Sequence, residues 1–297
     1  MPSREPASTR SRRIAALAAV PALRGIDGEA LAALADQIVE TPVRAAVPLP
    51  RAPGALRILP AGADSSSFDR GATFAASAPE LLPWLARSRS WSRAVVPTAS
   101  GYAYNVGVHA LRSLLRNDFS VTLGVTRALA RELVSTDHAL GFAMPAAPMP
   151  RAVAGDELLG LADRVLVLHA ALPFARKHAG SLLQLARHAV DVRVTDGTEL
   201  WRCGEAADKA LLIIRGEIVD QAAGGERFAA GAGAFVGLID ALLEQPRSSS
   251  AMARGRLVAL GLPMERWLDV LEDEPPLAEA FLGEIARQLL TAFRASR

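Results

Sequence analysis

A run of short apolar segments, each ending in glycine, constrains the fold of this chain more than any other feature. The segments are VDVRVTDG, ELWRCG, ALLIIRG and EIVDQAAGG, which lie within residues 190–225. Short segments that recur every roughly 8–12 residues, with glycine at the turns, are typical of a small antiparallel barrel or jelly roll. We therefore expect short antiparallel strands joined by glycine turns here.

The same order of elements occurs twice along the chain, and no third copy follows. In each copy, helices precede short strands, then come a small helix, one more strand and long helices. The pattern places the last strands at residues 93–96 and 257–260, and the long helices at 106–139, 264–271 and 277–293. We predict a mixed α+β fold with two small antiparallel barrels, each flanked by helices, and a long C-terminal helix.

Composition suggests the domain boundaries within the 297 residues, which suffice for two domains. Residues 1–13 are polar, rich in arginine and without periodicity, so we expect a disordered basic tail. Residues 141–155 contain three prolines and no periodic face, which predicts a linker. The two barrel domains are then expected at 14–140 and 156–297.

Charge and cysteine content narrow the classes of function. Lys and Arg total 33 against 31 Asp and Glu, a balance that does not favour a nucleic-acid binder. Cys203 is the only cysteine, so no intramolecular disulfide can form, and a reducing cytoplasm is the expected location. No apolar run approaches the ~18 residues of a membrane span.

Catalytic patterns are weak. The five histidines lack metal-ligand spacing, and there is no Gly-x-Ser-x-Gly elbow. We therefore expect neither an enzyme nor a bound cofactor.

Residues 231–253, GAGAFVGLIDALLEQPRSSSAMA, contain the main candidate site. Arg247 stands beside three serines and follows Gly237 and a short helical stretch. A fixed cation, small hydroxyl donors and backbone N–H groups that glycine lets come close are what a buried phosphate needs. The spacing Gly-x-Gly-x-x-x-Gly does not match a dinucleotide fingerprint. The pattern predicts a phosphate-bearing small ligand.

Residues 162–290 resemble the cyclic-nucleotide-binding domain found in catabolite activator proteins, regulatory subunits of cAMP-dependent protein kinase and some channels. The resemblance rests on the Gly204-Glu205 turn, on the strand pair 211–219, and on a phosphate cassette at 236–239 and 246–250. It implies cAMP or cGMP as the ligand.

The resemblance also implies roles for individual residues. Arg247 would pair with the cyclic phosphate, Ser248 would donate its hydroxyl with Ser249 beside it, and Gly237 would let backbone N–H groups approach. Leu238 stands where the family has a glutamate that accepts from the ribose 2′-OH. Losing that acceptor costs ~1–3 kcal/mol, or about ten- to a hundredfold in affinity.

The first half, residues 14–140, resembles the same domain more weakly. Glu80 and Arg93 correspond to the two ends of the cassette and are candidate ligand-binding residues, or else exposed surface charges. Ala78-Pro79 replaces the cassette glycine, and an insertion with Trp84 and Trp91 is expected to plug the pocket.

Two functions stay open. One is a regulatory sensor whose second barrel binds a cyclic nucleotide and whose C-terminal helices signal to a protein partner or a second copy of the chain. The other is a degenerate scaffold with closed pockets, in which Arg247 ion-pairs with a local carboxylate such as Glu244 and the serines form a polar turn. Specific DNA binding is not expected, since the chain ends at Arg297 directly after the last helix, without a helix-turn-helix.

Overall fold

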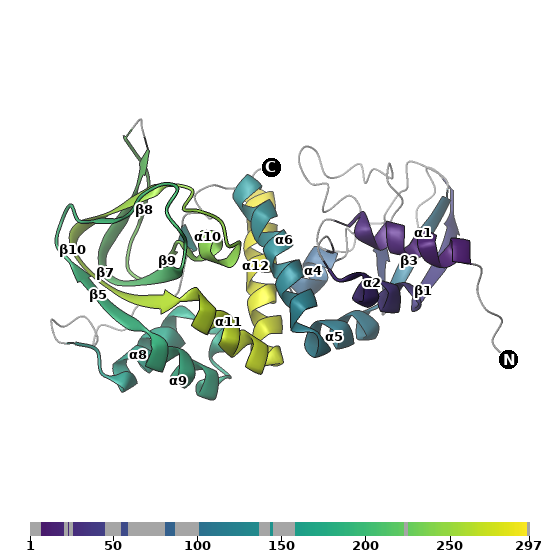
Figure 1. Ribbon diagram of the computed structural model, residues 1–297, viewed down its shortest axis with the longest axis horizontal. Coiled ribbons are helices and arrows are strands. Elements are labelled where there is room, and N and C mark those ends of the chain that lie inside the picture. The colour runs from purple at the N-terminus through teal and green to yellow at the C-terminus, as the bar shows by residue number, and fades with distance from the viewer. Residues whose placement is uncertain are drawn as a thin grey trace. The chain divides into compact units, whose positions relative to one another are not determined.

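The computed structural model describes residues 7–20, 23, 26–44, 55–58, 81–86, 101–136, 143–144, 158–222 and 225–295. The chain divides into two compact units, which are described one at a time below with the labels of Figure 1. The first unit consists of residues 1–132 and 282–297, and the second of residues 133–281.

The first unit contains a three-stranded antiparallel sheet in the order β1-β3-β2. Its strands are β1 (Ile38–Val43), β2 (Ala55–Ile58) and β3 (Gly101–Gly107). Val106 in the central strand lies opposite Ile38 on one side and Leu56 on the other. All three side chains are buried, so the pleat directs one face of the sheet into the core of this unit.

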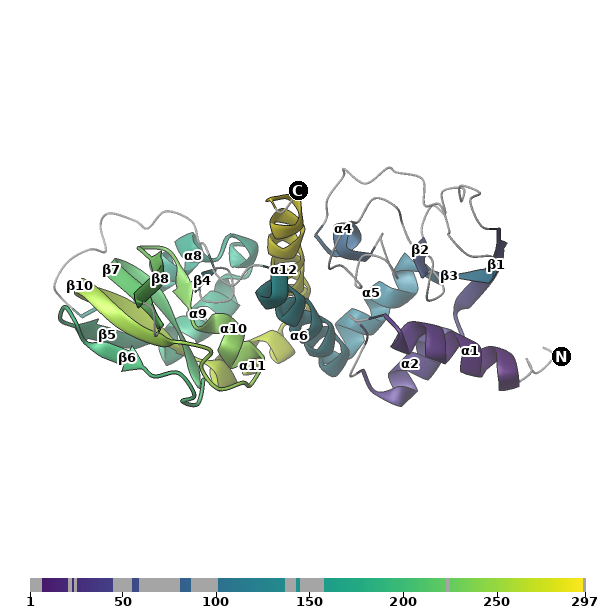
Figure 2. The ribbon, with the colours of Figure 1, turned by 90° about the horizontal axis from the view of Figure 1, so that it is seen from above.

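The other described elements that begin in this unit are helices. They are α1 (Ala7–Ala18), α2 (Gly28–Ala35), α4 (Leu81–Leu85), α5 (Val108–Asn117) and α6 (Phe119–Thr136), the last of which extends into the second unit. Figure 2 shows α1 and α2 side by side. Helices α5 and α6 confirm the two helical runs expected between residues 106 and 139.

Helix α1 starts before the predicted end of the basic tail. It begins at Ala7, and Arg10 donates two hydrogen bonds of 2.8 Å to the Asp36 carboxylate. Arg13 pairs with Glu40 at 3.1 Å. The expectation of disorder through Arg13 is therefore wrong from Ala7 onward, because the carboxylates that pair with these arginines lie far along the chain.

The described part of the second unit contains seven strands. They are β4 (Ala143–Met144), β5 (Val190–Val194), β6 (Glu199–Trp201), β7 (Lys209–Ala222), β8 (Gly225–Ala230), β9 (Phe235–Val236) and β10 (Ser250–Pro263). The sheet runs β4-β9-β7-β10-β5, with β6 also paired to β10 and β8 to β7, and all pairs are antiparallel. The mixed fold with antiparallel strands is confirmed, but the described strands form an open path and not a closed barrel.

Gly216 does not close a strand, contrary to the sequence prediction. It lies inside the continuous strand β7, with φ of 84°, and the pairing of β7 with β10 shifts register nearby. A Cβ at this position would lie 2.6 Å from the Arg256 carbonyl oxygen on β10. Glycine here permits a bulge that bends two long strands together, and sequence pattern alone does not distinguish such a bulge from a turn.

The helices of the second unit follow the predicted order. They are α8 (Leu161–Ala171), the 3-10 turn η3 (Pro173–Ala175), α9 (Ala179–His188), α10 (Leu238–Leu242), α11 (Met264–Asp273) and α12 (Pro275–Ala295), whose residues from 282 on belong to the first unit. An aromatic cluster packs α11 against its neighbours, with the Trp267 ring 5.3 Å from Phe281 and 6.4 Å from Phe235.

Part of the predicted linker is ordered. Ala143 and Met144 form β4, which pairs with Val236 and Phe235 of β9. The domain boundaries expected near residues 140 and 156 lie outside the described residues and stay a prediction.

Candidate anion site in the second unit

Gly237 has a conformation and surroundings that only glycine tolerates well. It precedes α10 with φ of 72°, in the left-handed region. A Cβ added there would lie 2.3 Å from the Nη1 atom of Arg247 and 3.3 Å from the Trp201 ring. The group that lies against Gly237 is the guanidinium of Arg247, whereas the predicted approach of backbone N–H groups to a phosphate stays a prediction.

Arg247 is almost completely buried, with 2% of its surface exposed. Its Nη1 donates to the Gly237 carbonyl oxygen at 2.9 Å, and its Nη2 donates to the Lys209 carbonyl oxygen at 2.6 Å. The guanidinium carbon also lies 4.3 Å from the centroid of the Trp201 ring, a cation–π geometry. The side chain is therefore held between two backbone carbonyls and an indole face.

The Arg247 charge has no directly paired carboxylate among the described residues. Its Nε has no hydrogen-bond partner there, and both Nη atoms donate to backbone carbonyls and not to the Glu244 carboxylate that was considered as an ion-pair partner. Burial lowers the pKa of Arg247 from its ordinary value, since removal from water disfavours the charged form. The negative charges of Asp240, Asp208 and Glu205 act in the opposite direction, in this order of size.

Ser248 and Ser249 differ in their surroundings. Both donors of Ser248 meet one carboxylate oxygen, because its N–H and its hydroxyl donate to Asp240 Oδ2 at 3.0 and 3.1 Å. Ser249 is buried, and its carbonyl accepts from Trp201 Nε1 at 3.1 Å. Both donors of Ser248 are therefore occupied by Asp240, while Ser249 contributes a backbone acceptor that fixes the tryptophan.

The Gly204-Glu205 turn anchors the backbone of Arg247. The Arg247 N–H donates to the Glu205 carbonyl at 2.7 Å, and the Gly204 N–H donates to the Arg247 carbonyl at 2.9 Å. This pair of bonds brings together two segments more than forty residues apart, both of which the sequence resemblance singled out. Leu238, the other cassette residue, is buried at the start of α10 with 5% of its surface exposed.

Sequence reasoning missed Trp201 as a site residue and underestimated Asp240. Trp201 is the last residue of β6, shortly before the Gly204 turn, and the Arg247 guanidinium stacks on its ring. Asp240 was not among the predicted site residues, although it lies within the cassette. A large aromatic before the turn and an acidic residue inside the cassette were the signals that pointed to them.

The candidates in the first half fall outside the described part of the chain. Glu80, Arg93 and Trp91 are not among the described residues, and neither is the strand expected at 93–96. Trp84 is described on α4, and the Arg112 guanidinium lies 5.6 Å from its ring centroid. Its expected role as a plug for a ligand pocket stays a prediction.

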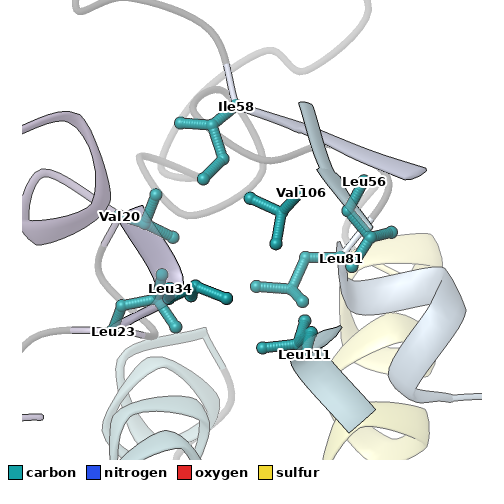
Figure 3. Close-up of a pocket in the computed structure, with 8 residues that line it drawn as sticks. All are labelled: Val20, Leu23, Leu34, Leu56, Ile58, Leu81, Val106 and Leu111. Atoms are coloured by element: carbon teal, nitrogen blue, oxygen red, sulfur yellow. The ribbon is translucent and has the colours of Figure 1, made fainter. Parts of the chain in front are cut away.

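The first unit contains a small apolar cavity of about 20 Å³ (Figure 3). Eight buried aliphatic side chains line it, from the sheet, from the helices α2, α4 and α5, and from the segment after α1: Val20, Leu23, Leu34, Leu56, Ile58, Leu81, Val106 and Leu111. These side chains offer no hydrogen-bond donor or charge, so this cavity does not suit a phosphate.

Filling this cavity by one methylene is expected to stabilise the protein slightly. Val106→Ile should raise the free energy of unfolding by up to about 0.8 kcal/mol in urea denaturation, the gain for one buried CH₂. Val125→Ile is the matched control, because Val125 is buried on α6 away from the cavity. There the extra atoms should cost about 1–3 kcal/mol through overpacking. Equal losses at both positions would mean that the cavity cannot accept the added group.

The ranges that the structure describes also bear on metal binding and on membrane insertion. Within those ranges, three or more His, Cys, Asp and Glu side chains nowhere gather as a metal-binding group. Of the helices described, none is both long and apolar enough to cross a membrane.

Comparison with known proteins gives structural matches only. No family model and no curated protein matches the chain. It is similar to the regulatory domain of Toxoplasma gondii PKA solved with cAMP, at 16% identity over 99% of this chain and 98% of the other, with a TM-score of 0.33.

Two bacterial structures match a smaller part of the chain. The cyclic nucleotide-binding-like protein from Brucella abortus is 24% identical over 37% of this chain and 98% of its own, with a TM-score of 0.33. A cyclic nucleotide-binding domain from Methylobacillus flagellatus is 22% identical over 42% and 78%, with a TM-score of 0.36. At these TM-scores the likeness is distant, and the chemistry of the site rests on the contacts described above.

Proposed function

We propose that the second unit is a non-enzymatic regulatory sensor that binds the phosphate of a cyclic nucleotide, cAMP or cGMP, at Arg247. One observation carries the proposal: the guanidinium of Arg247 is 2% exposed, unpaired with any described carboxylate, and has a free Nε. A buried cation without a counter-ion is unfavourable, and an anion that reaches it gains a strong charge-assisted hydrogen bond.

The neighbours of Arg247 support the choice of a phosphate. Ser248 supplies an N–H and a hydroxyl that already bind an anionic oxygen, that of Asp240. Gly237 provides the space over which the guanidinium lies. A phosphate with several acceptor oxygens can use the arginine and the serine together, whereas a single carboxylate oxygen cannot.

The experiment is a calorimetric titration of the full chain with cAMP, cGMP, adenosine and inorganic phosphate. We expect saturable binding of at least one cyclic nucleotide and none of adenosine, which lacks the phosphate. No heat with either cyclic nucleotide at millimolar concentration would overturn the proposal. Binding of adenosine as tight as that of cAMP would overturn it too, since the phosphate would then contribute nothing.

Leu238→Glu is expected to tighten cyclic-nucleotide binding by about ten- to a hundredfold, because a carboxylate there can accept from the ribose 2′-OH. The control ligand is 2′-deoxy-cAMP, for which Leu238→Glu should bring no gain. An equal gain for both ligands would show that the glutamate does not act through the 2′-OH. Because Leu238 is buried, circular dichroism must first show that the variant is folded.

The second candidate function is a scaffold that binds no nucleotide. It is favoured because most polar groups of the site already have hydrogen-bond partners within the chain. The Arg247 Nη atoms donate to backbone carbonyls, and Asp240 accepts from both donors of Ser248. In that case none of the four ligands should bind, and neither Leu238→Glu nor removal of Asp240 should create binding.

A further inference from the structure

The Asp240 carboxylate lies where an anionic ligand would have to bind. Its Oδ2 accepts from both the N–H and the hydroxyl of Ser248, eight residues later in the chain. The same carboxylate exerts the strongest of the negative-charge effects on Arg247. Asp240 thus interacts with the two residues to which the proposed function assigns the ligand phosphate.

Two anions cannot share these groups without cost. A phosphate oxygen that accepts from Ser248 must displace the Asp240 oxygen, since one N–H and one O–H cannot each serve two anionic acceptors at full strength. If both anions stay close, their like charges repel at short range in a partly buried site. Arg247, the other residue to which the proposed function assigns the phosphate, is 2% exposed, and its Nε has no partner among the described residues.

We propose that Asp240 determines the affinity and selectivity of this site, by acting as an internal carboxylate that competes with the ligand phosphate for the donors of Ser248. This inference rests on the proposed function and deepens it. The site then responds only to an anion able to replace a carboxylate that the chain itself supplies. A neutral nucleoside would gain nothing from displacing Asp240.

The test compares variants of the full chain by calorimetry with cAMP, cGMP and inorganic phosphate as probes. Asp240→Ala should lower the Kd for a cyclic nucleotide by about tenfold or more, since it frees two donors and removes a like charge. Asp208→Asn is the matched control, because Asp208 also acts electrostatically on Arg247 but makes no side-chain hydrogen bond to Ser248. It should change the Kd less than about threefold, as expected of a screened surface charge.

Ser248→Ala distinguishes two effects of Asp240 on ligand binding: its competition for the donors of Ser248 and its charge repulsion of the phosphate. In the double variant with Asp240→Ala, the gain should become smaller, because the freed hydroxyl is gone while the freed N–H and the relief of charge repulsion remain. Asp240→Asn covers the case in which Asp240→Ala does not fold, since the amide oxygen still accepts from Ser248 without the charge. Asparagine should give a gain smaller than alanine and larger than Asp208→Asn.

The outcomes separate this inference from the proposed function. If the wild type binds and Asp240→Ala binds equally well, the inference is wrong and the proposed function stands. If the wild type does not bind but Asp240→Ala does, the inference holds and the native chain is not a nucleotide sensor. If neither binds at millimolar concentration, both are wrong. Equal gains from Asp240→Ala and Asp208→Asn would overturn the competition for Ser248 and leave only charge repulsion.

Discussion

Gly237→Ala is expected to destabilise the second unit by about 2–5 kcal/mol. An alanine in the left-handed region costs about 1–2 kcal/mol in backbone strain. The added Cβ would also lie 2.3 Å from Arg247 Nη1, so this atom must leave the Gly237 carbonyl oxygen, which costs about 1–3 kcal/mol when the oxygen is buried without a partner. Urea denaturation followed by circular dichroism measures the loss.

Gly255→Ala is the control for backbone strain alone. Gly255 has the same φ of 72° but nothing within 4 Å of an added Cβ. Gly255→Ala should therefore lower the free energy of unfolding by the backbone strain alone, about 1–2 kcal/mol. The additional loss of stability in Gly237→Ala, compared with Gly255→Ala, should become smaller when Arg247 is also replaced by alanine. The added Cβ then no longer meets a guanidinium. Equal losses for the two glycines would contradict the packed arrangement of Arg247 over Gly237.

Arg247→Met is expected to abolish cyclic-nucleotide binding while changing stability little. Methionine keeps the long side chain over Trp201 but lacks the charge. Removing charge-assisted bonds to the phosphate should weaken binding by about a hundredfold or more. In the free protein, two opposing effects meet: two carbonyls lose donors, at about 1–3 kcal/mol each, and a desolvation penalty of several kcal/mol for a buried cation is relieved.

We therefore expect the free energy of unfolding of Arg247→Met to lie within about 2 kcal/mol of wild type, because the two effects are of similar size. Calorimetry and urea denaturation of the same preparation measure both quantities. Arg202→Met is the control, since Arg202 is exposed and pairs with Glu199. A loss of stability near 5 kcal/mol with unchanged affinity would identify Arg247 as a structural brace only.

Local patterns in the sequence predicted much of the second unit. The short apolar segment that ends in glycine at 190–197 and the helix expected at 264–271 match β5 and α11. Gly216 was misjudged, since a glycine at positive φ forms a turn or a bulge depending on the partner strand, and that partner, β10, lies some forty residues away. The start of α1 was missed for the same reason, as its arginines pair with distant carboxylates.

The sequence singled out some residues of the candidate site, but neither Trp201 nor the contacts between the residues. Gly237 and Arg247 were placed together by spacing and resemblance, and they do lie in contact. The stacking of Arg247 on Trp201 depends on how β6 meets the loop before β10, which no local pattern encodes. The bond between Asp240 and Ser248 likewise depends on the path of the chain between α10 and β10.

The most direct measurement of phosphate binding at Arg247 is the ¹⁵N–¹H signal of its Nε. That N–H is buried and has no partner among the described residues, so it should exchange slowly with water, and its signal can be assigned by its absence in Arg247→Met. We expect addition of cAMP or cGMP to move this signal downfield in proton as a charge-assisted hydrogen bond forms, with adenosine leaving it in place. A signal that stays unmoved at millimolar concentrations of both cyclic nucleotides would contradict phosphate recognition by Arg247.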